Sequence, residues 1–165
     1  MDDITGWLAG RLPDEWFEGP PQVSVDRDEI LVVGVLPEPT AGPEEPGRRA
    51  AEAGRIKRFR EETRSRRMRI ADEAEQRFGR KVAWGASCGQ TREVFTSLSV
   101  PVMTRLRQPE RMVLDTLVEA GVARSRSEAL AWSVRLVGQH QREWIDQLRE
   151  ALVAVEAARA AGPVT

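Results

Sequence analysis

The sequence contains one cysteine and one histidine, and this scarcity excludes several kinds of site. Cys88 has no second cysteine to pair with, so no disulfide can form within the chain, and a reducing compartment fits. With His140 as the only histidine, the familiar Cys/His zinc patterns cannot be built. The segment GASCGQT does not match the phosphate-binding G-x-x-x-x-G-K-[ST] loop, so we expect Cys88 to be a buried or turn cysteine without catalytic use.

Long apolar runs are also lacking. No stretch approaches the ~18 apolar residues that a membrane-spanning helix needs. The N-terminus, MDDITGWLAGRLPDEW, is acidic where a signal peptide would be basic. No pair of carboxylates sits in a motif that separates a catalytic dyad from solubility charge. We therefore expect a cytoplasmic protein that is not an enzyme and that uses no membrane, metal or cofactor.

Charge is abundant but unevenly distributed. The net charge is −1, yet residues 1–46 hold 11 acidic and 2 basic groups, whereas residues 47–81 hold 13 basic and 6 acidic groups. Residues 82–165 are nearly balanced, with 10 basic and 9 acidic groups. This asymmetry predicts either an external partner for the basic stretch or contact between the acidic and basic segments.

Local patterns predict an α+β fold in three regions. Residues 1–46 contain a short helix or two turns, then a β-hairpin from alternating valines and the apolar run 30–36, then a linker rich in Pro, Gly and Glu at 37–47. Residues 47–81 are the basic helix region, in which residues 48–78 carry an apolar stripe at a 3.6 period and Gly79 is the expected helix stop. Residues 82–165 hold short strands near 82–84 and 95–106, a helix at 109–120 and a long helix at 126–160 that Gly138 bends.

The basic helix is the first candidate nucleic-acid site. Residues 48–69 contain ten Arg or Lys against three Glu. Arginine forks match phosphate oxygens, and such a helix lying along duplex phosphates binds with salt-dependent, sequence-independent affinity. The alternatives are a solvated helix whose arginines pair with nearby glutamates, and a helix screened by the acidic arm of its own chain. The candidate DNA-contacting residues are Arg55, Lys57, Arg58, Arg64, Arg66 and Arg67.

The second candidate is the segment LSVPVMTRL, residues 98–106, with the helices that follow it. Leu98, Val100 and Val102 share one parity, which predicts a strand with one apolar face that a second chain would cover. Pro109 suits a first helical turn, Gly121 suits a helix stop, and the S-x-x-E motif from Ser125 to Glu128 predicts a capping box.

Strand, helix, turn with SRSEAL and helix together resemble the ribbon–helix–helix (MetJ/Arc-type) DNA-binding family over about residues 98–140. The resemblance implies an obligate homodimer whose paired strands enter the major groove and whose second-helix N-termini bind phosphate. By position, the implied DNA-contacting residues are Ser99, Met103 and Arg105 of the strand and Arg124, Ser125, Arg126 and Ser127 of the turn.

The strand departs from the family's pattern in two ways. Arg105 is its only long donor, and Pro101 has no N–H for a ladder. Two functions therefore stay open. One is a dimeric duplex DNA-binding protein, either a transcriptional regulator or a nucleoid-associated factor. The other is a dimeric protein–protein adaptor that docks on a larger machine through its acidic N-terminal region without reading DNA.

Overall fold

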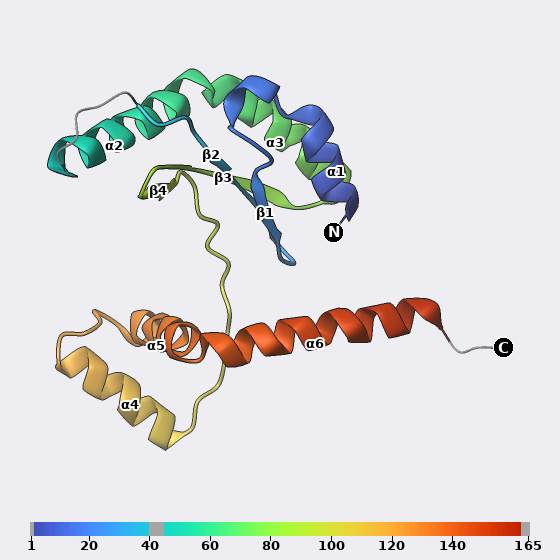
Figure 1. Cartoon of the computed structure of the whole chain (residues 1–165). Helices are drawn as coiled ribbons and strands as arrows, with labels where there is room; N and C mark the ends of the chain where they lie inside the picture. The colour runs from blue at the N-terminus through green and yellow to red at the C-terminus, as the bar shows by residue number, and fades with distance from the viewer. Residues whose placement is uncertain (1, 40–44, 163–165) are drawn as a thin grey trace. The chain divides into compact units, whose positions relative to one another are not determined.

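The computed structural model describes residues 2–39 and 45–162 and divides the chain into two compact units, residues 1–101 and 102–165 (Figure 1). The fold is α+β, as the sequence predicts. Strands near residue 82, which sequence reasoning grouped with the C-terminal helices, lie in the first unit. The predicted linker at 37–47 lies partly outside the described residues.

A four-stranded mixed sheet organises the first unit. Its strands are β1 (Gln22–Val25), β2 (Glu29–Val35), β3 (Lys81–Cys88) and β4 (Thr91–Val94), in the spatial order β1-β2-β3-β4. The predicted hairpin is confirmed, because β1 and β2 pair antiparallel. β2 and β3 pair parallel, and β3 and β4 pair antiparallel. A parallel pair needs a long crossover, which the basic helical segment provides.

Three helices cover one face of this sheet (Figure 1): α1 (Asp2–Arg11), α2 (Glu45–Glu62) and α3 (Arg64–Phe78), with a 3-10 turn, η1 (Asp14–Trp16), after α1. The single helix expected at 48–78 is divided at Thr63, whose hydroxyl donates to the carbonyl of Phe59 at 2.6 Å. Gly79 ends α3 in the left-handed conformation, with φ 68°, as predicted. One buried stripe continues through the break: Glu52, Ile56, Phe59, Thr63, Arg67, Ile70 and Ala74.

Aromatic rings fill the space between the helices and the sheet. Trp16 of η1 meets Phe59 of α2 and Trp84 of β3 edge-on, with ring centroids 5.6 and 6.1 Å apart. Phe17 covers Gly34 of β2 so closely that a Cβ at position 34 would overlap its ring. The core therefore joins η1 to residues that follow it by more than forty positions.

The second unit contains α4 (Gln108–Glu119), α5 (Arg126–His140) and α6 (Arg142–Ala161). Gly121 takes a positive φ of 75° after α4, and the Ser125 hydroxyl accepts the N–H of Glu128 at 3.2 Å, so the predicted stop and cap are confirmed. The predicted long helix is interrupted at Gln141 rather than bent at Gly138. The buried core of the second unit is small and consists of Leu114, Ala123 and Ala129.

The prediction of a strand at residues 98–106 is wrong. Residues 96–107 form neither helix nor strand, and the second strand of this region is β4, at 91–94. Val102 and Met103 are 86% and 96% exposed. β4 pairs with β3 through the turn at Gly89. Among the described residues, no strand pairs with the backbone of residues 98–106, and Pro101 has no N–H to donate to such a pair.

Candidate nucleic-acid interface

The arginines of α2 and α3 divide into paired and unpaired groups. Arg66 forms an ion pair with Glu15 at 2.9 Å, and its guanidinium lies over the Trp16 ring. Arg60 forms an ion pair with Glu93 of β4 at 3.3 Å. Four of the predicted DNA-contacting residues have no carboxylate within ion-pair distance in the described part of the chain: Arg55, Lys57, Arg58 and Arg64.

The acidic N-terminal arm contacts the basic helices at several points. Besides Glu15, Asp3 lies 3.7 Å from Arg77 of α3, and Arg11 of α1 makes two bonds to Glu73 of α3, at 2.6 and 2.7 Å. The bonded guanidinium holds the pKa of Glu73 below its ordinary value. Glu15 and Asp3 therefore screen Arg66 and Arg77 of α3, as one alternative expects, whereas the Arg11–Glu73 pair has the opposite polarity and neutralises an acidic residue of α3.

Arg67 differs from the other candidates in being buried, with only 6% of the residue exposed. Its Nε donates to the Thr63 hydroxyl at 2.9 Å, and its Nη2 donates to the carbonyl of Arg60 at 2.6 Å. Burial, together with the charges of Arg60 and Arg64, lowers its pKa to about 10. This guanidinium is too deep to lie along the phosphates of a duplex.

Aromatic residues that sequence reasoning did not connect with the arginines lie directly beside them. The Phe95 ring is covered by the guanidinium groups of Arg67 and Arg60, at 5.0 and 5.6 Å from its centroid. Phe95 follows β4 and its N–H donates to the carbonyl of Trp84 at 2.7 Å, so the β3–β4 hairpin brings it under α3. A strand assigned to 91–94 would have placed Phe95 beside β3, but the helix that covers its ring is decided by the tertiary fold.

Glu52 holds the β3–β4 hairpin against α2. Its carboxylate accepts the Thr91 hydroxyl at 2.6 Å, and only 2% of the residue is exposed. The Thr91 bond, with the backbone N–H groups of Gln90 and Thr91, lowers the pKa of Glu52. Gly89 has φ 54°, and a Cβ there would overlap this carboxylate. Glu52 therefore fixes the hairpin that positions Phe95.

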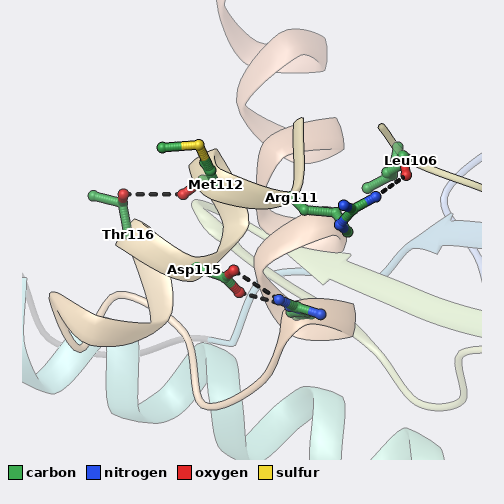
Figure 2. A network of polar contacts seen from close by, with 6 residues as sticks. Leu106, Arg111, Met112, Asp115 and Thr116 are labelled. Carbon is green, nitrogen blue, oxygen red and sulfur yellow. Dashed lines mark hydrogen bonds and ion pairs between the residues drawn. The ribbon is translucent and has the colours of Figure 1, made fainter. Parts of the chain in front are cut away.

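The turn between α4 and α5 uses its polar groups internally. Arg126 makes two hydrogen bonds to Asp115 of α4, both 2.6 Å, and Figure 2 shows the Asp115 carboxylate receiving them. The Glu128 carboxylate accepts the N–H of Arg124 at 2.8 Å, and Ser125 caps the helix. Ser127 is exposed. The resemblance implied a turn whose side chains face phosphate, but Arg126 and Ser125 instead stabilise the α4–α5 hairpin.

The remaining candidates, Ser99, Met103 and Arg105, are exposed on the irregular segment 96–107 and share no face of a strand. Among the described residues, no helix is both long and apolar enough to cross a membrane.

Comparison with known proteins decides the family. Residues 2–94 match the family described as Rv1265-like protein, N-terminal domain, and residues 107–159 match the Mb1296 C-terminal domain. The chain belongs to the Rv1265-like family. The proteins named "Uncharacterized protein Rv1265" of Mycobacterium tuberculosis and "Uncharacterized protein Mb1296" of Mycobacterium bovis are each 61% identical over 157 residues, which cover 95% of this chain and 69% of the relative. No solved structure matches the chain.

These matches overturn the ribbon–helix–helix resemblance. The helical region that suggested it lies within the Mb1296 C-terminal domain, and the strand that completed the motif is absent. A helix, a Gly stop and an S-x-x-E cap are general devices for any helical hairpin, so the motif was shared without the fold.

Proposed function

We propose that this protein is a cytoplasmic, dimeric duplex DNA-binding protein, acting as a transcriptional regulator or nucleoid-associated factor. The observation that carries the proposal is a row of cations on α2 and at the start of α3 that have no carboxylate partner among residues 2–39 and 45–162: Arg55, Lys57, Arg58 and Arg64. Ion pairs neutralise Arg60, Arg66 and Arg77 close by. Unpaired arginines on an exposed helix attract phosphates and release counterions when they bind.

Dimerisation is supported by the C-terminal unit. Only one leucine and two alanines of its core are buried, with Leu106, Leu117, Val118 and Leu130 partly buried against them. Large apolar side chains along α5 and α6 stay exposed: Val134, Val137, Trp144, Leu148, Leu152, Val153 and Val155. Most of them follow a heptad-like spacing, which is typical of helices that pack against a second helix. A second copy of the chain would cover this stripe and would double the number of cationic helices available to one duplex.

Fluorescence anisotropy with a labelled duplex at two salt concentrations tests the proposal. Binding should weaken with salt, with a slope of about 0.9 per phosphate contact. The double substitution Arg55→Gln with Arg58→Gln should reduce both affinity and slope. The matched control, Arg135→Gln with Arg142→Gln, removes the same charge from α5 and α6 and should change neither.

Absence of binding at low salt would contradict the DNA proposal. Loss of binding only in the control variant would move the contact to the C-terminal unit. The adaptor alternative makes a different forecast: protein partners recovered from a lysate would survive nuclease treatment, and substitution of Asp14 and Glu18 on the acidic arm would release them.

A further inference from the structure

A groove of about 800 Å³ lies between the α2–α3 segment and the β3–β4 hairpin. This volume is in the range of small-molecule sites in proteins. One wall is a cationic stripe at helical spacing, formed by Lys57, Arg60, Arg64 and Arg67. Apolar side chains complete the lining, chiefly Met68, Val82, Trp84 and Phe95. Arg55 and Arg58, the cations tested against DNA, do not line it.

Arg67 supplies a buried positive charge to this groove. No carboxylate lies within ion-pair distance of its guanidinium in the part of the chain that the structure describes. Its two side-chain hydrogen bonds go to a hydroxyl and a carbonyl, both uncharged. Buried cations are ordinarily paired, because removing a charge from water is costly. Burial beside Arg60 and Arg64 lowers the pKa of Arg67, so an anion placed here would relieve an unfavourable charge.

Trp84, another residue of the lining, has an indole N–H without a hydrogen-bond acceptor among the described residues. Its Nε1 is buried, although a buried indole N–H usually finds an acceptor. An atom buried this completely lies beneath the surface of the groove, so the group that a bound ligand would meet is the Arg67 guanidinium.

The charge of the lining selects the class of ligand. Four cations line the groove against two carboxylates, Glu61 and Glu93, which leaves an excess of two positive charges. A phosphate monoester carries about −1.5 to −2 at neutral pH, whereas a carboxylate or a DNA phosphodiester carries a single charge. The apolar lining beside the cations suits a flat, uncharged body attached to the phosphate.

We propose that this groove binds a small organic phosphate monoester with a flat apolar body, whose phosphate lies beside Arg64 and Arg67. The apolar body lies against Met68, Val82 and the aromatic lining. Because the groove flanks α2, such a ligand would also change the charge beside the cations that we assign to DNA. The proposal does not depend on DNA binding, since it rests on Arg67, which is too deeply buried to lie along a duplex.

Isothermal titration of the full chain with phenyl phosphate tests the site. Phosphate alone, phenol and benzoate are the comparison ligands, and each should bind at least roughly tenfold more weakly, because each lacks either the apolar body or the doubly charged head. Arg64→Gln, an exposed position, should weaken phenyl phosphate roughly tenfold or more, the loss expected for a charge-assisted contact. Arg92→Gln on β4 removes a charge outside the groove and should leave binding unchanged.

Three results would overturn the proposal. The first is no heat of binding with phenyl phosphate at millimolar concentration. The second is equal affinity in the wild-type chain and the Arg64→Gln variant. The third is displacement of phenyl phosphate by duplex DNA with the same dependence on Arg64, which would assign the groove to the nucleic-acid surface. Arg67→Met should abolish binding, and if that variant fails to fold, Arg64→Gln still decides.

Discussion

Arg126 and Asp115 are joined by two parallel hydrogen bonds, from Nε and Nη2 of the guanidinium to the two carboxylate oxygens, both 2.6 Å long. The pair connects the first residue of α5 to the second half of α4 across the turn. A fork-to-fork pair of this geometry fixes orientation as well as charge. The arginine that a DNA-binding turn would have pointed at phosphate is thus a structural element of the helical hairpin.

We expect Arg126→Gln to raise the pKa of Asp115 toward the ordinary value of an aspartate. The bonds from Arg126 are the largest cause of its lowered pKa. Since the folded pKa lies below the unfolded one, the pair stabilises the hairpin above the unfolded pKa and this contribution is lost as pH falls through the folded pKa. A carboxyl titration by NMR checks this, with Arg135→Gln as the control. An unchanged Asp115 titration would contradict the pairing.

Ser125→Ala should destabilise the C-terminal unit by about 1 kcal/mol, because the side chain caps α5 through the N–H of Glu128. Ser127→Ala is the matched control: it lies two residues later, is exposed, and should change stability by less than about 0.5 kcal/mol. Urea unfolding followed by circular dichroism, at one protein concentration, compares the two. Equal effects would mean that the cap contributes little.

Two glycine substitutions should have opposite effects. Gly89→Ala should destabilise the N-terminal unit by more than about 1 kcal/mol, since φ is 54° and the new Cβ would overlap the Glu52 carboxylate. Gly54→Ala, in mid-α2 with open space around its Cβ, should stabilise by up to about 1 kcal/mol. Thermal unfolding of both variants measures the difference, and a shift of the same sign in both would contradict the assigned conformations.

Cys88 should be nearly unreactive in the folded protein. The residue is fully buried, and burial, followed by the charge of Glu52, raises the pKa of its thiol. Both effects lower the thiolate concentration that an alkylating reagent needs. Iodoacetamide should modify Cys88 quickly in urea and only at the rate of local opening without it. Fast labelling of the folded chain would show that the hairpin end of β3 opens readily.

The molecular mass in solution should be twice the 18.5 kDa of one chain. Leu148→Glu should shift the protein toward the monomer, because it places a charge on the exposed apolar stripe of α6. Gln147→Glu adds the same charge one position away, off the stripe, and should leave the dimer intact. Sedimentation velocity at micromolar concentration distinguishes these outcomes, and a monomeric wild-type chain would remove the dimer from the proposal.

Short-range sequence patterns predicted the structure correctly where a few neighbouring residues decide it. The valine alternation before residue 26 and the apolar run after it gave the β1–β2 hairpin, and Gly79, Gly121 and Ser125 marked helix ends. The confirmed features each depend on a few neighbouring residues. The prediction of a strand at 98–106 failed because an alternation of apolar and polar residues does not supply a strand to pair with. Residues 91–94 have such a partner in β3.

The sequence by itself determined which segments are helical, the hairpin, the arginine-rich stripe and the separation of acidic from basic charge, but not the helix breaks at Thr63 and Gln141, because periodicity, capping and composition act within a few residues. Only the tertiary structure decided which arginines are neutralised, which one is buried, and which aromatic rings lie beneath them. Those outcomes depend on β3 pairing in parallel with β2 across a crossover of more than forty residues, and no local pattern encodes which side chains that pairing brings together.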